Sequence, residues 1–121
     1  MTIDIIIFLV LLQIKHWYVD FVNQSAIEVQ GKGTYGEFHG MMHSAKHGIG
    51  TVVCALLVTG YTYLIFAFIL GLIDALTHYH IDWAKMNYGN RDINNPTFWN
   101  HLGLDQMAHQ IVYIFIAFFM S

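Results

Sequence analysis

The chain has 121 residues, of which 56% are hydrophobic, 16% are aromatic and only 11% are charged. Soluble domains carry about a quarter charged residues, so this composition indicates a membrane protein and excludes a disordered chain. A single cysteine excludes a disulfide scaffold, and a formal net charge of −3 argues against a nucleic-acid partner. Eight histidines against five lysines and arginines are unusual in so apolar a chain.

Four stretches are long enough to cross a bilayer as helices, which takes about 20 mostly apolar residues. They cover approximately residues 3–24, 38–59, 61–86 and 104–120. Their polar positions keep a helical spacing and do not alternate with apolar ones as in membrane strands. We therefore predict an all-α protein with a single domain over residues 1–121, folded as an integral membrane four-helix antiparallel bundle with short loops.

The connections between these helices differ in length. Residues 25–37 contain three glycines and are predicted to form a loop, and a tight hairpin is expected around Gly60. Residues 89–103 are polar and contain the only proline, Pro96, so a longer loop is expected there. Loops of these lengths allow neighbouring helices to lie antiparallel.

Each predicted helix has one apolar half and one polar half. In an alternating bundle the four polar halves meet at the same end of the molecule. All the cations belong to this polar end: Lys15, Lys32, Lys46, Lys85 and Arg91. Basic residues are concentrated on the cytoplasmic side of membrane proteins. We therefore expect a bacterial inner-membrane protein with both termini outside and the polar end toward the cytoplasm.

Histidine and aspartate recur at four-residue intervals in every predicted helix. The first carries His16 and Asp20, the second His39, His43 and His47. The third and fourth continue the pattern with these residues: His78, Asp82, Asp105 and His109. Residues four apart share one helix face. Placing a charged side chain in the middle of a bilayer costs about 2.5–3.5 kcal/mol on insertion scales, so such side chains face the bundle interior. The four polar stripes are therefore expected to converge.

Converging imidazoles and carboxylates are typical of a metal site. We predict a divalent metal, with zinc as the first choice, and enough ligands for one ion or two. The candidate ligands are His16, His43, His47, His78, Asp82, Asp105 and His109. Two further residues are candidates for catalytic roles. Asp20 would act as a base or as a carboxylate that orients a ligand, and Lys85 would neutralise an oxyanion or hold a phosphate head group.

The remaining polar residues of the helices are weaker candidates. His39 is expected near the membrane surface as a solvated residue at a helix start. His80 is out of phase with His78 on the same helix, and His101 falls in the predicted loop. Asp74 lies in the middle of its helix, where its role stays open.

Four motifs resemble DUF3307, a family of small phage and bacterial membrane proteins of unknown function. The segment His16–Gln24 resembles its H-x-x-x-D-F-x-x-Q opening, and His43 with His47 resembles its second-helix histidine pair. The other two motifs are H-x-x-x-D-x-x-K, at His78 to Lys85, and D-Q-x-x-H, at Asp105 to His109. The resemblance implies an integral membrane protein, often phage-borne, and brings no established reaction. A more distant similarity, in helix count and His/Asp pairs, is to membrane-bound metal-dependent hydrolases.

Two classes of function follow from these residues. The first is a membrane-embedded metal-binding protein that acts as a hydrolase on a lipid or lipid-linked substrate at the cytoplasmic leaflet. The alternative is a non-enzymatic module: a proton or metal relay, a haem binder, or a phage–host interaction protein whose polar stripes hold the helices together. Its partner would be a phage or host protein, or a second copy of the chain. A di-iron carboxylate centre does not fit, because the only glutamates, Glu28 and Glu37, lie in a predicted loop.

Overall fold

The computed structural model describes residues 2–120, so Met1 and Ser121, the ends of the predicted domain, lie outside the described residues. Within that range the chain is all-α, as predicted, with no strand. The α-helices are α1 (Thr2–Trp17), α2 (Ala26–Gly31), α3 (Phe38–Thr59), α4 (Leu64–Tyr88) and α5 (Pro96–Phe118). A π-helical turn, Tyr18–Val22, extends α1, and a 3₁₀ turn, Tyr61–Tyr63, leads into α4.

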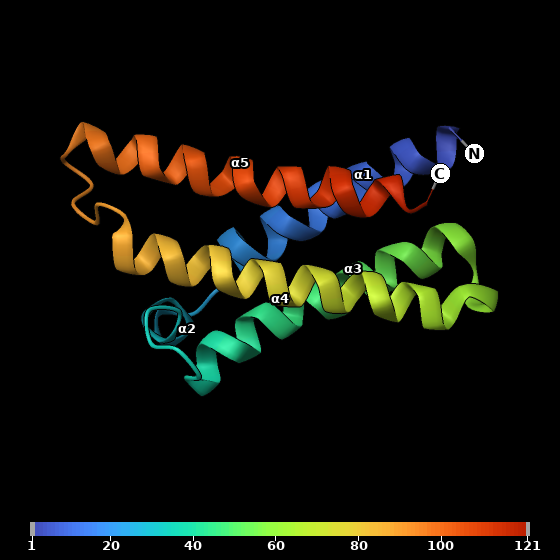
Figure 1. Ribbon diagram of the computed structural model, residues 1–121, viewed down its shortest axis with the longest axis horizontal. Helices are drawn as coiled ribbons and strands as arrows, with labels where there is room; N and C mark the ends of the chain where they lie inside the picture. Colours follow the sequence, from blue (N-terminus) through green and yellow to red (C-terminus); the bar gives the residue numbers. More distant parts are fainter. Residues whose placement is uncertain (1, 121) are drawn as a thin grey trace.

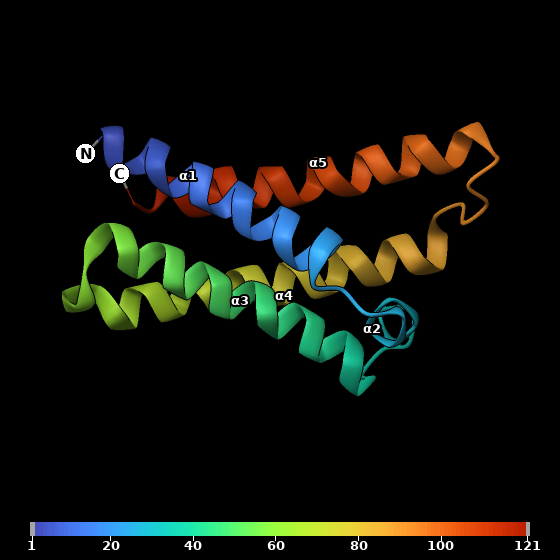
Figure 2. The same cartoon turned by 180° about the vertical axis from the view of Figure 1, so that it is seen from behind.

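Four long helices pack side by side and alternate in direction along the chain (Figure 1). Both termini lie at the same end as the connection between α3 and α4. The opposite end carries the short helix α2 and the α4–α5 connection (Figure 1). Seen from behind, α1 lies across the other long helices, and it contacts both α3 and α5 (Figure 2).

Helices α3 and α4 make the most extensive contact, and two glycines explain how close they come. A Cβ atom added at Gly48 would lie 2.7 Å from the carbonyl oxygen of Gly71, and one added at Gly71 would lie 2.6 Å from that of Gly48. Larger residues at either position would therefore push the helices apart. Small residues at such crossings are typical of membrane helix pairs.

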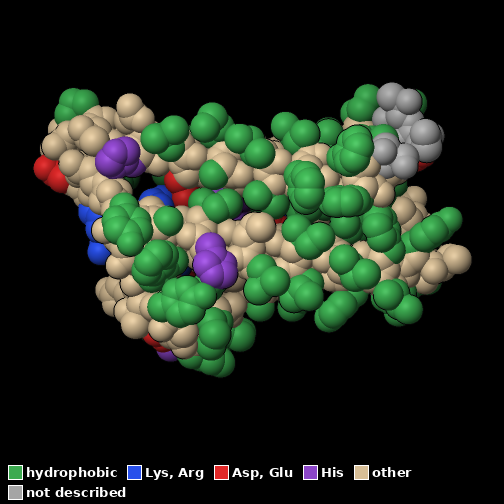
Figure 3. Space-filling model, in the orientation of Figure 1, with side chains coloured by type: hydrophobic (Ala, Val, Ile, Leu, Met, Phe, Trp, Pro, Cys, Tyr) green, Lys and Arg blue, Asp and Glu red, His purple; other side chains and the backbone are tan. Residues whose placement is uncertain are grey.

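The outer surface of the long helices is strongly apolar. Ile65 is 79% exposed, Leu57 70% and Ile49 65%, although all are large hydrophobic residues. Hydrophobic side chains are spread along the whole face shown in Figure 3, whereas most charged ones lie at the end that carries α2. Among the described residues, three helical segments are long and apolar enough to cross a membrane: 3–22, 38–59 and 61–88. The segment predicted at 104–120 is not among them, because α5 is polar in its first half.

Two elements differ from the sequence prediction. Helix α2 lies in the predicted loop 25–37, where Ser25 and Glu28 form a capping box that starts a helix. Helix α5 begins at Pro96 rather than near residue 104, because Asn95 caps it by accepting a hydrogen bond from the Thr97 N–H. Proline is favoured in the first helical turn, so Pro96 marks a helix start rather than a loop.

Candidate metal centre

Asp20 is the residue around which the first group of polar side chains gathers. It lies in the π-helical turn after α1, and such turns occur frequently at functional sites. Its Oδ1 atom is 2.9 Å from Nε2 of His43, 3.1 Å from Nε2 of His47 and 3.6 Å from Nε2 of His78. The three histidines are fully buried, so one carboxylate oxygen meets three imidazole nitrogens away from solvent.

A second group forms on the α4–α5 side of the first. His78 Nε2 lies 3.2 Å from Asp82 Oδ2, and His109 Nε2 lies 3.5 Å from Asp82 Oδ1. His109 Nε2 is also 3.5 Å from Oδ1 of Asp105, one turn earlier in α5. Helices α4 and α5 therefore bring together the two His/Asp pairs that the sequence placed four residues apart.

Two sets of buried residues offer ligand atoms close enough for one ion, and they share His78. In each set the ligand atoms lie within 4.8 Å of one another. Among the described residues, the first set is Asp20, His43, His47 and His78, and the second is His78, Asp82 and His109. Imidazole nitrogens with carboxylate oxygens suit zinc and several other divalent metals. These buried groups could hold a metal ion, whose identity the ligand types leave open.

The hydrogen bonding of the histidines supports this interpretation. The His78 ring is stacked between two others, 3.5 Å from the His47 ring centroid and 4.1 Å from that of His109. Among the described residues, both ring nitrogens of His78 and Nε2 of His109 have no hydrogen-bond partner. Buried polar atoms are nearly always paired in folded proteins, so the unpaired Nε2 atoms of His78 and His109, both near oxygens of Asp82, fit an ion as the missing partner.

Two predicted ligands lie beside the sets rather than within them. His16 donates a hydrogen bond from Nε2 to Gln106 Oε1 at 2.9 Å, and its Nδ1 is hydrogen-bonded to the Tyr113 hydroxyl at 2.9 Å. Its Nε2 is also 3.3 Å from Asp20 Oδ2. Asp105 binds the Lys85 ammonium, 3.0 Å away. The structure thus gathers all seven predicted ligands, with Asp20 and Lys85, in one region. Five of the seven, together with Asp20, form the two sets.

Lys32 contacts the same centre, although the sequence analysis did not single it out. It caps the C-terminal end of α2, and its ammonium lies 2.8 Å from Asp82 Oδ2 and 3.8 Å from Asp20 Oδ1. It also donates a hydrogen bond to Gln24. Lys32 is buried even though it lies outside the long helices. Its only sequence signal was its membership of the cations at the polar end.

A buried ion pair lies next to the centre, toward the apolar half of the molecule. The Lys15 ammonium is 2.6 Å from Asp74 Oδ2, 3.0 Å from the Tyr113 hydroxyl and 3.4 Å from Nδ1 of His47. Thr51 donates a further hydrogen bond to Asp74 at 2.5 Å. Asp74, whose role the sequence left open, therefore compensates a lysine that reaches inward. This network supports His47 from the side opposite Asp20.

The other three histidines lie away from the centre. His39 is exposed and binds the Glu37 carboxylate at 2.8 Å. His80 binds the Tyr35 hydroxyl at 2.9 Å, and His101 accepts a hydrogen bond from the backbone N–H of Asn90. These contacts explain the residues as local links at the polar end.

A further contact at the polar end ties α2 to α3. The Glu28 carboxylate lies 2.5 Å from the ammonium of Lys46 and accepts a hydrogen bond from the backbone N–H of Ser25. Burial disfavours the charged carboxylate, but the contacts with Lys46 and Ser25 outweigh it and lower the pKa of Glu28 to about 2. Glu28 is therefore ionised at neutral pH and holds α2, which carries Lys32, against α3.

Comparison with known proteins gives a family but no reaction. No curated protein and no solved structure matches the chain significantly. A family model described as a protein of unknown function, DUF3307, matches residues 7–121, which include every residue of the two ligand sets. Because the match covers nearly the whole sequence, the chain belongs to the DUF3307 family.

Proposed function

We propose that this protein is a membrane-embedded, metal-dependent hydrolase that acts on a lipid or lipid-linked substrate. In this proposal the four long helices form an antiparallel bundle that crosses the membrane, with the polar end toward the cytoplasm. The observation that carries the proposal is the convergence of Asp20, His43, His47, His78, Asp82 and His109 from four elements on one buried point. Burying so many ionisable groups is costly and rarely serves stability alone.

Zinc is the metal that we propose for this point. Either set could hold it: His43, His47 and His78 on α3 and α4, with the Asp20 carboxylate beside them, or His78, Asp82 and His109 on α4 and α5. A bound zinc ion supplies Lewis acidity, which polarises the scissile group and lowers the pKa of a bound water to about 7. Both sets use His78, so the same imidazole would serve whichever set holds the ion.

The chain's own residues would carry out the rest of the reaction. Asp20, with its second oxygen 3.3 Å from His16, would accept the proton from the attacking water. Lys85 would stabilise negative charge on the substrate, because its half-buried ammonium lies beside Asp105 at the edge of the centre. Gln106 and Tyr113 would hold the His16 ring in place through its two nitrogens.

Metal content and hydrolysis test this proposal together. We would purify wild-type protein, His78→Gln and the matched control His80→Gln, which changes an exposed histidine on the same helix. We expect His78→Gln to lose zinc, measured by inductively coupled plasma mass spectrometry, and to lose hydrolysis of a radiolabelled bacterial lipid extract. His80→Gln should retain both. Wild-type protein without stoichiometric metal, under conditions that retain zinc, would contradict the proposal.

A proton or metal relay is the second candidate, and the Lys15 network is the observation that favours it. Hydrogen-bonding groups run from Asp20 through His47 and Lys15 to Asp74. Beyond Asp74, however, the interior is apolar, with Phe8, Leu12, Leu70 and Ile116 almost fully buried. A relay needs polar groups across the whole membrane, so this dry half favours the hydrolase. Proton or zinc flux into proteoliposomes that depends on Asp74 would reverse the preference.

A further inference from the structure

Two hollows meet at Lys85, and neither is needed to explain how a metal would be held. The first is a cavity of about 280 Å³ at the polar end, between α2, α4 and the start of α5. Asp82 of the candidate centre lines it, together with the cations Lys32, Lys85 and Arg91. Phe98, from the first turn of α5, adds an apolar wall. The cavity therefore joins the centre to the polar end of the molecule.

The charges in this cavity favour an anion. Lys32 and Lys85 are paired with Asp82 and Asp105, at 2.8 and 3.0 Å respectively. Arg91 is exposed and forms no hydrogen bond or ion pair with any residue between 2 and 120. If Asp82 serves as a metal ligand, part of its negative charge is shared with the ion, and Lys32 becomes available as well. Three cations around one small cavity match a phosphate group, which arginine binds with two parallel hydrogen bonds.

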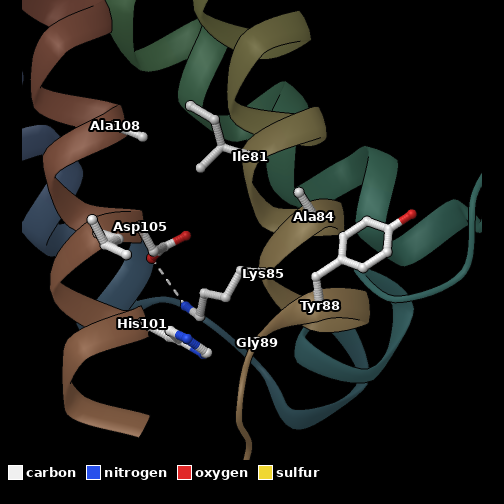
Figure 4. A pocket seen from close by; sticks show the side chains of 9 residues that line it. Ile81, Ala84, Lys85, Tyr88, Gly89, His101, Asp105 and Ala108 are labelled. Carbon is white, nitrogen blue, oxygen red and sulfur yellow. Dashed lines mark hydrogen bonds and ion pairs between the residues drawn. The ribbon is translucent and has the colours of Figure 1, made fainter. Parts of the chain in front are cut away.

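The second hollow is a groove of about 320 Å³ between α4 and α5. Ile81 and Ala84 line it from α4, Ala108 lines it from α5, and the ion pair between Lys85 and Asp105 crosses it (Figure 4). Its lining is otherwise mostly apolar, and the small alanine side chains leave the space open. Leu104 and Met107 are exposed hydrophobic residues of α5 at this level, so the groove opens toward the region that membrane lipids would occupy in the proposed bundle.

We propose that these hollows bind a phosphate-bearing lipid, with the phosphate between Lys32, Lys85 and Arg91 and a hydrocarbon chain in the α4–α5 groove. The proposal rests on the function proposed above and specifies its substrate class. Charge complementarity selects the headgroup, and the apolar groove that continues from Lys85 selects a chain attached to it. The headgroup then lies next to Asp82 of the metal centre, while the chain remains among other lipids.

Binding to the zinc-loaded protein tests this assignment without turnover. The probe is the phosphonate analogue of dioleoyl phosphatidic acid, in which carbon replaces the bridging ester oxygen. Dioleoylglycerol has the same chains without phosphate, and glycerol 3-phosphate has the headgroup without chains. We expect native mass spectrometry to show clear preference for the phosphonate over both. Equal binding of dioleoylglycerol would overturn the headgroup assignment, and equal binding of glycerol 3-phosphate would overturn the lipid assignment.

Two variants test the two halves of the site separately. Arg91→Gln should bind the phosphonate about tenfold more weakly, because it loses one charge-assisted contact. Arg91→Lys keeps the charge and should lose less affinity. Ala108→Phe should weaken binding by filling the groove. The matched controls are His39→Gln, an exposed side chain at the polar end that lines neither hollow, and Ile114→Phe, which adds a ring elsewhere on α5. Both controls should bind as wild type.

Zinc content, measured on the same samples, separates this proposal from the proposed function. Arg91→Gln and Ala108→Phe should keep wild-type zinc, because neither residue belongs to a ligand set. Zinc-loaded variants that bind the phosphonate as wild type does would overturn the lipid site and leave the metal centre standing. If the protein takes up no zinc but still prefers the phosphonate, and Arg91→Gln and Ala108→Phe weaken that binding, only the proposed hydrolase function is refuted. If Ala108→Phe fails to fold, Arg91 in the exposed connection still decides the headgroup assignment.

Discussion

The two halves of the long helices are built on opposite principles. In the half near the termini, apolar side chains such as Leu12, Leu70 and Ile116 fill the interior. In the other half the same helices bury imidazoles and carboxylates, among them His43 and Asp82. An apolar core requires only that shapes fit, whereas a buried ionisable group also requires a partner at a defined distance. Changes in the first half should therefore affect stability, and changes in the second should affect binding first.

The largest effect is expected at Asp20, whose carboxylate meets three histidines. Asp20→Asn keeps the size of the side chain but removes its charge. Zinc affinity should fall by about 100-fold or more, because even residues that only orient ligands contribute roughly 10–100-fold to metal affinity. Competition with a fluorescent chelator measures the affinity. Asp92→Asn in the α4–α5 connection is the matched control and should bind normally. Unchanged zinc affinity in Asp20→Asn would remove Asp20 from the centre.

Asp74 stands at the boundary between the two halves. Asp74→Asn leaves the buried Lys15 without its ionic partner, which in buried pairs costs about 3–5 kcal/mol of unfolding free energy. Reversible unfolding in mixed detergent micelles measures this. The double variant Lys15→Met with Asp74→Leu should recover much of the stability, because it removes both charges. A double variant no more stable than Asp74→Asn would show that the pair is not the cause.

Leu12 tests the apolar half alone. It is fully buried, so Leu12→Ala should lower the free energy of unfolding by about 2–5 kcal/mol through the cavity that it leaves. Zinc content of the folded protein should stay unchanged, because Leu12 packs in the dry half. Parallel unfolding and metal measurements check both expectations. Loss of zinc from folded Leu12→Ala would show that the two halves are coupled.

The smallest effect is expected at Glu28, outside the membrane-spanning segments. Its pKa is lowered from 4.5 to about 2 in the folded protein, so its stabilising contribution is present above pH 4.5 and is lost as the pH falls toward 2. The difference in unfolding midpoint between wild type and Glu28→Gln should therefore shrink between pH 6 and pH 2.5. Glu37→Gln serves as a comparison without the Lys46 contact. A difference that does not change with pH would show that the Lys46 contact contributes no stability.

The spacing of residues along each helix predicted much of the polar half. The four-residue intervals at His43/His47, His78/Asp82 and Asp105/His109 placed each pair on one face, and the bilayer's cost for ionisable groups turned those faces inward. The same logic failed for Lys32, because α2 is too short to show a periodic pattern. It also missed the early start of α5, because Asn95 and Pro96 were interpreted as loop residues.

Composition and periodicity were sufficient for the all-α class and for the general location of the polar groups, because both depend on local geometry and on solvation. They could not show that His78 is shared by two ligand sets, that Lys15 turns inward to Asp74, or that Arg91 borders a cavity reaching Asp82. These relations join residues from different helices. They depend on how the helices cross, rotate and bend. Examples are the close approach of Gly48 and Gly71 and the π-helical turn that carries Asp20. The spacing of residues along one helix does not determine such packing.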